Sequence, residues 1–172
     1  NLLQALYLAG GPTKNGSLRK IIVLRKGKRK TSFDLYPFLL SGDTESAARA
    51  MADGDTIFVP PIGSVVAICG EVKRPAIYEL REKTSLRNLI NIAGGFLPSA
   101  SLARIQIERI ENFRRKILLD VEPKNNLFLK DNDLIRVFSI GKRIYNSVSL
   151  EGMVKHPGDY QLKPLMRLKD VL

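Results

Sequence analysis

Residues 70–80 read GEVKRPAIYEL, and residues 152–162, 82 positions later, read GMVKHPGDYQL. The apolar residues on either side of a proline-containing turn predict a β-hairpin, because proline fixes one backbone dihedral and removes a hydrogen-bond donor. A hairpin that occurs twice indicates a chain built from repeated units. The letters shared by the two stretches are Gly70 and Gly152, Val72 and Val154, Lys73 and Lys155, Pro75 and Pro157, Tyr78 and Tyr160, and Leu80 and Leu162.

A short helix is predicted over LRNLINIAGG at residues 86–95, and LLQALYLAGG at residues 2–11 has the same pattern. In both stretches apolar residues recur at helical spacing. Both stretches then end in paired glycines, and Gly10 and Gly94 can adopt the left-handed conformation that ends a helix. A phosphate-binding loop places its glycines before a helix, so we interpret these as helix stops.

Two strands, paired as a hairpin, are predicted after each helix. In the first copy of the repeat they cover residues 20–26 (KIIVLRK) and 30–36 (KTSFDLY). In the middle copy they cover residues 104–110 (RIQIERI) and 114–121 (RRKILLDV). Short apolar runs rich in β-branched residues and bounded by turn residues are typical of strands.

Each unit closes with an acidic turn that leads into a short apolar strand, DGDTIFVPP at residues 53–61 and DNDLIRVFS at residues 131–139. The order of elements is therefore strand, strand, helix, strand, strand, strand. A sheet that buries one face under a single helix is a two-layer α+β arrangement. We predict tandem β-grasp (ubiquitin-like) domains, with one helix packed on a mixed sheet in each copy.

The domain boundaries follow from where the motifs recur. Residues 1–60 are a first copy that lacks its opening hairpin, and residues 61–141 are a complete copy. Residues 142–172 supply the opening hairpin and the helix start of a third copy, with Leu165, Leu168 and Leu172 at helical spacing. Such long periods indicate an array of small domains, because solenoid repeats are about 20 to 50 residues long. Since the chain begins without methionine, we expect it to be a piece of a longer protein.

The composition, with 44% hydrophobic and 26% charged residues, is that of a folded globular chain. No apolar run reaches the roughly 18 to 20 residues that cross a bilayer. The formal net charge of +11 indicates an anionic partner, such as nucleic acid, a lipid headgroup or an acidic polymer. The single cysteine, Cys69, lies in the apolar run SVVAICG, and we interpret it as a buried hydrophobic residue rather than a nucleophile.

These motifs resemble the soluble-ligand-binding β-grasp domain of outer-membrane polysaccharide export proteins of Gram-negative bacteria. The resemblance rests on GEVKRPAIYEL, SLRNLINIAGG and DNDLIRV, which occur in the family's order. The phrase YPFLLSG, followed by MADGDTIFVPP, resembles the longer, multi-copy capsule export members. The likeness covers essentially the whole chain. One departure is Ala76, where the family usually has glycine, as at Gly158, and this leaves the type of that turn open.

The resemblance implies a periplasmic, non-catalytic module associated with the outer membrane of a Gram-negative bacterium. It implies a protein that exports capsular polysaccharide or exopolysaccharide, assembles with its own copies into a ring, and meets other export and inner-membrane transport components. We therefore expect a scaffold for ring assembly. A direct contact with the exported anionic polysaccharide is left open.

The sequence offers no catalytic or metal-binding set. His156 is the only histidine and lies in the turn KHPG, at the place of Arg74, so we interpret it as a solvated turn residue without an orienting partner. The aspartates of the two acidic turns supply too few oxygens for calcium, and we interpret them as turn formers. We predict no enzyme activity, no metal and no cofactor.

Two hairpins carry clustered cations and are the candidate sites for an anionic glycan. The run LRKIIVLRKGKRK has Gly27 at its predicted tip, and ENFRRK occupies the equivalent hairpin of the middle copy. Two basic tips in register would form a positive stripe that attracts an acidic polymer and weakens with salt. The alternative is a solvated edge, because exposed cations prevent edge pairing. The candidate residues are Arg25, Lys26, Lys28, Arg29, Arg114, Arg115 and Lys116.

The repeated hairpin supplies four further candidates. Tyr78 and Tyr160 occupy matching positions and could stack against a sugar, although packing over the hairpin is the alternative. Lys73 and Lys155 lie in the matching turns and could contact the same glycan, with solvation of the turn as the alternative.

Two other functions are compatible with the sequence. One is a stand-alone module in which one copy captures a carbohydrate or a small ligand. The other is a nucleic-acid-binding basic domain, suggested by an isoelectric point near 10.0. The chain has no tryptophan, no aromatic-and-basic stacking signature and no helix-turn-helix pattern, so we expect no nucleic-acid partner.

Overall fold

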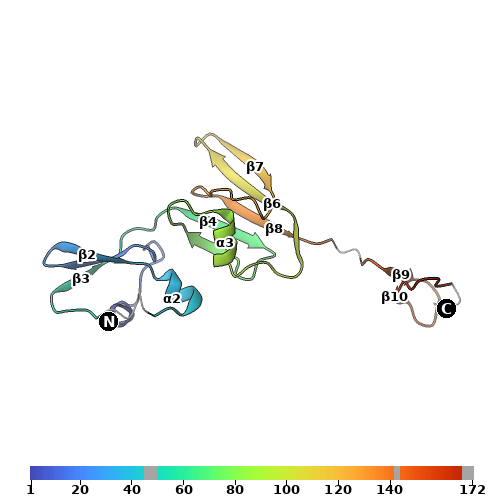
Figure 1. The fold of residues 1–172 in the computed structure, drawn as a ribbon, viewed down its shortest axis with the longest axis horizontal. Coiled ribbons are helices and arrows are strands. Elements are labelled where there is room, and N and C mark those ends of the chain that lie inside the picture. The colour runs from blue at the N-terminus through green and yellow to red at the C-terminus, as the bar shows by residue number, and fades with distance from the viewer. Residues whose placement is uncertain (45–49, 142–143, 168–172) are drawn as a thin grey trace. The chain divides into compact units, whose positions relative to one another are not determined.

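The computed structural model describes residues 1–44, 50–141 and 144–167. These residues form two compact units, Asn1–Ser139 and Ile140–Leu172 (Figure 1). The first unit holds a three-stranded and a five-stranded sheet, and the second holds a two-stranded sheet. Leu165, at the start of the helix predicted for the third copy, lies in a turn with a φ of +63°, and Leu168 and Leu172 lie outside the described residues.

The first sheet, in the order β2-β1-β3, is antiparallel throughout. Its small core joins Leu2 and Leu6 of the helix α1 to Ile21 and Val23 of β1 and to Phe33 of β2. The helix is held at this core by a short apolar stripe, since Leu2 and Leu6 lie one turn apart. The elements of this half are α1 (Leu2–Leu8), β1 (Ile21–Arg25), β2 (Lys28–Phe33), α2 (Tyr36–Ser41) and β3 (Asp55–Phe58).

The second sheet is mixed, in the order β5-β4-β8-β6-β7, with β4 and β8 parallel and the other pairs antiparallel. One helix, α3, lies against one face of it (Figure 1). The α+β class predicted from the sequence is therefore confirmed. The elements are β4 (Val65–Gly70), β5 (Ala76–Glu79), α3 (Leu86–Ile92), β6 (Ala100–Glu111), β7 (Arg115–Val121) and β8 (Leu134–Ser139).

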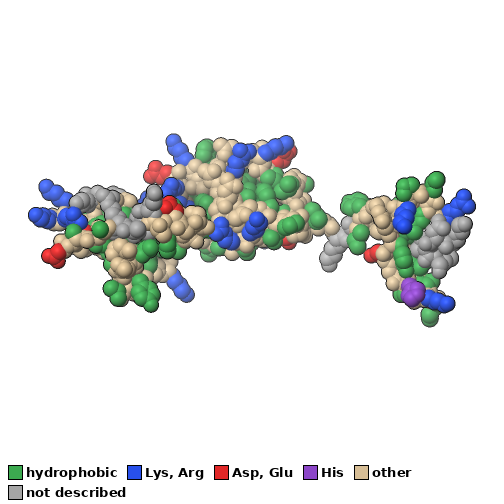
Figure 2. All heavy atoms as spheres, turned by 60° about the horizontal axis from the view of Figure 1, so that its bottom comes forward, with side chains coloured by type: hydrophobic (Ala, Val, Ile, Leu, Met, Phe, Trp, Pro, Cys, Tyr) green, Lys and Arg blue, Asp and Glu red, His purple; other side chains and the backbone are tan. Residues whose placement is uncertain are grey.

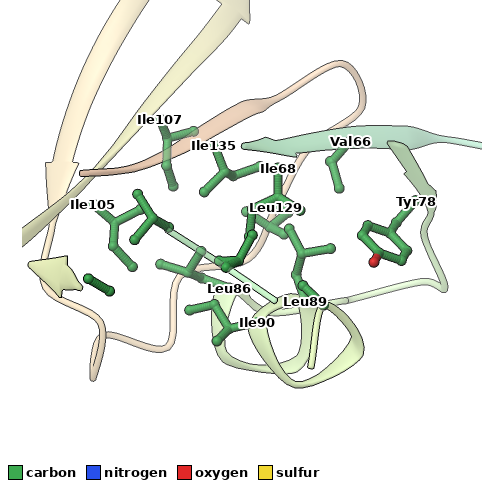
Figure 3. Packing of buried hydrophobic residues seen from close by; sticks show 14 of the residues in the cluster. Val66, Ile68, Tyr78, Leu86, Leu89, Ile90, Ile105, Ile107, Leu129 and Ile135 are labelled. Atoms are coloured by element: carbon green, nitrogen blue, oxygen red, sulfur yellow. The ribbon is translucent and has the colours of Figure 1, made fainter. Parts of the chain in front are cut away.

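The main core lies between α3 and this sheet (Figure 3). Burial alternates along β4, because successive side chains of a strand point to opposite faces. Val66 and Ile68 face the helix, whereas Cys69 faces away and is only partly buried, so its predicted burial is wrong. The helix contributes three buried side chains at helical spacing, Leu86, Leu89 and Ile90.

The predicted glycine stops are confirmed at both helices. Gly10 and Gly94 have φ values of +82° and +83°. The next N–H group then folds back onto the last turn: Gly11 donates to the carbonyl of Leu6 at 2.8 Å, and Gly95 donates to that of Ile90 at 2.9 Å. These bonds satisfy carbonyl groups that a helix end leaves unpaired.

The repeated hairpin has the same pairing in both copies. Val66 lies opposite Tyr78 in the first unit, and Val148 lies opposite Tyr160 in the second, 82 positions later. The turn begins in the same way too, because the N–H of Val72 donates to Gly70 O at 2.8 Å and that of Val154 to Gly152 O at 2.9 Å. The strands of the second unit are β9 (Ser147–Leu150) and β10 (Gly158–Gln161).

The predicted strand over residues 30–36 is wrong at its end. The strand β2 stops at Phe33, and the helix α2 begins at Tyr36. Asp34 Oδ1 accepts a 2.9 Å bond from the N–H of Tyr36, and Pro37 lies in the first turn, where its missing N–H costs nothing. These two local preferences turn the chain into a helix that the apolar pattern alone does not indicate.

Candidate functional site

The first basic hairpin is the turn between β1 and β2. Lys26 and Gly27 have positive φ values of 49° and 72°, so the predicted tip at Gly27 is confirmed. Lys26 and Lys28 are exposed at this tip. The side chain of Arg29 lies outside the described part of the structure.

Arg25, at the base of the same tip, is held by an acidic residue of β3. Its Nε and Nη2 donate to Asp55 Oδ1 and Oδ2 at 2.5 and 2.6 Å. The Asp55 side chain is only 3% exposed, whereas that of Arg25 is 34% exposed. The hydrogen bond to Asp55 also raises the pKa of Arg25 above its usual value. This guanidinium is therefore occupied within the fold.

The middle copy contains an equivalent arginine–aspartate pair that is more deeply buried. Arg109 of β6 donates from Nε and Nη2 to the two carboxylate oxygens of Asp133 at 2.8 and 2.7 Å. The two side chains are 7% and 0% exposed. Asp133 also accepts the N–H of Lys130 at 2.8 Å, and its hydrogen bonds to Arg109 raise the pKa of that guanidinium. Each acidic turn thus ties the last strand of its copy to the central hairpin.

Reasoning from the sequence missed these pairs, although the repeat carries a signal for them. Arg25 and Arg109 lie 84 positions apart, the same offset as the two helices, and Asp55 and Asp133 lie 78 positions apart, the offset of the two acidic turns. A cation and an acid that recur together at matching places are candidates for a structural pair. The aspartates are therefore anchors as well as turn formers.

The second basic hairpin is the turn between β6 and β7. Its tip residues Asn112 and Phe113 have positive φ values of 52° and 54°. Two of its three candidate cations have acidic partners: Arg115 Nε donates to Glu111 at 2.8 Å, and Lys116 lies 2.6 Å from Glu108. Arg114 forms no ion pair with any residue that the structure describes.

The cations that remain available are distributed over separate places. On the face drawn in Figure 2, Lys and Arg side chains stand out at several points of the surface rather than in one continuous stripe. Among the described residues, no hydrogen bond or ion pair joins the two hairpin tips. Among the candidate side chains that the structure describes in the first unit, those without an acidic partner are Lys26, Lys28, Lys73 and Arg114.

Both tyrosines of the repeated hairpin close the turn that they follow. Tyr78 Oη donates to the carbonyl of Arg74 at 2.8 Å, and Tyr160 Oη donates to that of His156 at 2.6 Å. Tyr78 is buried, and burial raises the pKa of its phenol. Lys73 and Lys155 are exposed in the same two turns.

The two copies of the first unit meet at Glu79, the last residue of β5. Its carboxylate is almost completely buried, at 2% exposed. Oε1 accepts the hydroxyl of Ser17 at 2.7 Å and the N–H of Gly63 at 3.0 Å, while Oε2 accepts the N–H of Leu18 at 3.0 Å. A buried carboxylate needs several donors, and here the preceding copy supplies two of them.

A second layer of contacts surrounds this carboxylate. Arg19 Nε donates to Glu79 O at 2.6 Å, and Glu79 N donates to Tyr36 Oη at 2.8 Å. The guanidinium of Arg19 also lies 3.7 Å from the centre of the Tyr36 ring. Asp34 joins the two copies again, because it pairs with Arg19 at 3.2 Å and with Arg81 at 2.5 Å.

A cleft with a volume of about 610 Å³ lies beside this junction. Its lining comes from both copies: Tyr36 and Leu40 of α2 on one side, Asn88 and Asn91 of α3 on the other. Arg74 and Lys83 are exposed at its edge. Sequence patterns gave no signal for the cleft, because it forms only where two copies dock.

The described residues contain no group of three or more His, Cys, Asp or Glu side chains placed to hold a metal ion. In the same ranges, no helix has both the length and the apolar character needed to span a membrane.

Comparison with known proteins identifies the repeated motif. The family model described as the SLBB domain matches residues 1–34 and 65–117, together just over half of the chain. Two Escherichia coli proteins, each named polysialic acid transport protein KpsD, are 35% identical to it over 85 residues. That alignment covers 49% of this chain and 15% of each relative, so the chain spans a small part of their length.

Proposed function

Because this chain belongs to the SLBB domain family, we propose that it is a non-catalytic scaffold module of a polysaccharide export protein in the periplasm of a Gram-negative bacterium, associated with the outer membrane. The similarity to the two polysialic acid transport proteins supports a role in capsule or exopolysaccharide export. In this proposal each copy is a β-grasp domain, and the copies follow one another along the chain.

The observation that carries the scaffold role is the buried junction at Glu79. Two short linked domains usually move against each other unless their interface is well packed. Here a buried carboxylate, an ion pair to Asp34 and the edge-to-face contact of Tyr36 with Tyr78, at 6.4 Å between ring centres, all cross between the copies. A module with a fixed spacing suits a repeated position in a ring.

The proposed partners are other copies of the same protein in a ring, further export components of the envelope and inner membrane, and the anionic polysaccharide itself. The net charge of +11 supports the last of these. Nucleic acid is not among the partners that we propose. Such a contact needs cations that have no acidic partner within the fold.

The test is a domain exchange in the Escherichia coli relative. The segment of about 85 residues that aligns with this chain is replaced by the corresponding residues of this chain. We expect the chimera to restore surface polysaccharide to cells that lack the native protein. A chimera that accumulates as a folded, protease-resistant protein and still exports no polysaccharide would contradict the proposal.

A further inference from the structure

We propose that the cleft between α2 and α3 binds a carboxylate-bearing saccharide, with Arg74 and Lys83 pairing with the carboxylate. The cleft is the space lined by Tyr36, Leu40, Arg74, Lys83, Asn88 and Asn91 beside the Glu79 junction. The inference rests on the proposed function and deepens it, because it assigns the glycan contact to a specific place between the two copies.

The cleft has the size of a ligand site and is held in shape before any ligand arrives. Its volume of about 610 Å³ falls within the roughly 300 to 1,000 Å³ that small-molecule sites occupy. Its two walls belong to different copies, and the buried hydrogen bonds of Glu79 fix one copy against the other. A preformed site loses little conformational entropy on binding.

The charge of the lining favours an anion. Four cations line the cleft, Arg19, Arg74, Arg81 and Lys83, against two acids, Asp34 and Glu82. Asp34 is already engaged by Arg19 and Arg81.

Arg74 and Lys83 are the cations left to a ligand. The Arg74 guanidinium donates a long hydrogen bond, 3.5 Å from Nη1 to the carbonyl oxygen of Leu40. Lys83 forms no ion pair with the described residues. An arginine fork and a lysine ammonium are the groups that proteins use to bind carboxylates.

The remaining lining suits a sugar rather than a nucleotide. Asn88 and Asn91 are exposed one turn apart on α3, so their amides can donate to and accept from hydroxyl groups. Leu40 and Pro37 offer an apolar wall for the C–H groups of a sugar ring. The aromatic ring of the lining, Tyr36, already carries Arg19 on its face, so it offers no free platform for stacking a base.

The experiment measures binding of the full chain to two matched probes, tetragalacturonic acid, which carries carboxylates, and maltotetraose, which is neutral. Titration calorimetry at about 0.15 M salt limits nonspecific attraction. We expect saturable binding of the acidic probe alone, and at least a tenfold weaker affinity in the double variant Arg74→Gln, Lys83→Gln. Both residues are exposed, so we expect the variant to fold normally. An unchanged thermal unfolding temperature will verify this.

The control is the double variant Lys26→Gln, Lys28→Gln at the first hairpin tip, which also removes two positive charges. The two variants are matched in backbone conformation too, because Lys26 and Lys83 both have a positive φ, of 49° and 57°. We expect its affinity to stay within twofold of the unchanged chain. The cleft proposal is overturned if the acidic probe does not bind, if the cleft variant binds as well as the unchanged chain, or if both variants lose affinity equally. The domain exchange tests the export function separately, because its readout is polysaccharide at the cell surface, whereas calorimetry tests the cleft.

Discussion

The buried carboxylate of Glu79 accepts a 2.7 Å hydrogen bond from the hydroxyl of Ser17, which lies 62 positions earlier in the preceding copy. The N–H groups of Leu18 and Gly63 donate to the same carboxylate, so its hydrogen bonds are satisfied at the interface between the copies. In the hairpin of the third copy the same place holds Gln161. The structure therefore links the first and middle copies through a residue within the motif that defines them.

Replacing Glu79 by alanine should destabilise the first unit by about 2 to 4 kcal/mol. The change leaves the Ser17 hydroxyl and two N–H groups without their acceptor, and unsatisfied buried groups cost about 1 to 3 kcal/mol each before relaxation. Urea unfolding followed by circular dichroism measures the loss. The matched control is Glu82→Ala at an exposed position three residues later, where we expect a change below about 0.5 kcal/mol.

The two arginine–aspartate pairs should differ in their contribution to stability. Removing one partner from a buried pair costs about 3 to 5 kcal/mol, because the other charge is left without compensation. We expect Arg109→Ala to fall in this range, since Asp133 is fully buried. Arg25→Ala should cost less, because a third of that arginine side chain is exposed. Equal losses in urea unfolding of the two variants would contradict this reading.

Gly70 should tolerate no side chain. A Cβ atom there would lie 1.9 Å from the carbonyl oxygen of Val137, and the φ of +89° is unfavourable for any other residue. We expect Gly70→Ala to lower the unfolding free energy by more than about 2 kcal/mol. Gly152 is the control, because it has a φ of +101° at the matching place but no atom within 4 Å of an added Cβ. Its alanine variant should be clearly milder.

The stability of the first unit should decline as the pH rises above 10, in part through Tyr78. Burial raises the pKa of this phenol in the folded state above the value of 10.0 in the unfolded chain. The folded state therefore holds its proton where the unfolded state releases it, so the contribution is complete below pH 10 and is lost above it. Urea unfolding between pH 9 and 11 should show a shallower decline in Tyr78→Phe. The exposed Tyr7→Phe variant should follow the unchanged chain.

The repeat made the local structure predictable. The hairpin at residues 70–80 and its copy at 152–162 fold with the same pairing, because proline, glycine and tyrosine fix each turn by local contacts. Gly10 and Gly94 end their helices as expected, since a left-handed residue at that place depends only on the neighbouring turn. The strand that ends at Phe33 is shorter than the apolar pattern predicts, because that pattern does not reveal the hydrogen bond from the N–H of Tyr36 to Asp34.

The candidate site was less accessible to prediction. Clustered cations on the hairpins were visible in the sequence, but whether a cation is free depends on acids from distant strands. Arg25 pairs with a residue 30 positions away, and the cleft depends on contacts between residues about 60 positions apart. Such contacts follow from how the copies dock, which no local pattern specifies.

The most direct test of the account is a distance measurement across the Glu79 junction in the full chain. Spin labels are attached at Tyr7→Cys in α1 and Leu118→Cys in β7, two exposed positions in different copies, with the native Cys69 replaced by alanine. We expect one narrow distance distribution by pulsed electron resonance, and a broad one when Glu79→Ala is added. A broad distribution already present with Glu79 in place would contradict the claim that this carboxylate joins the two copies into one rigid body.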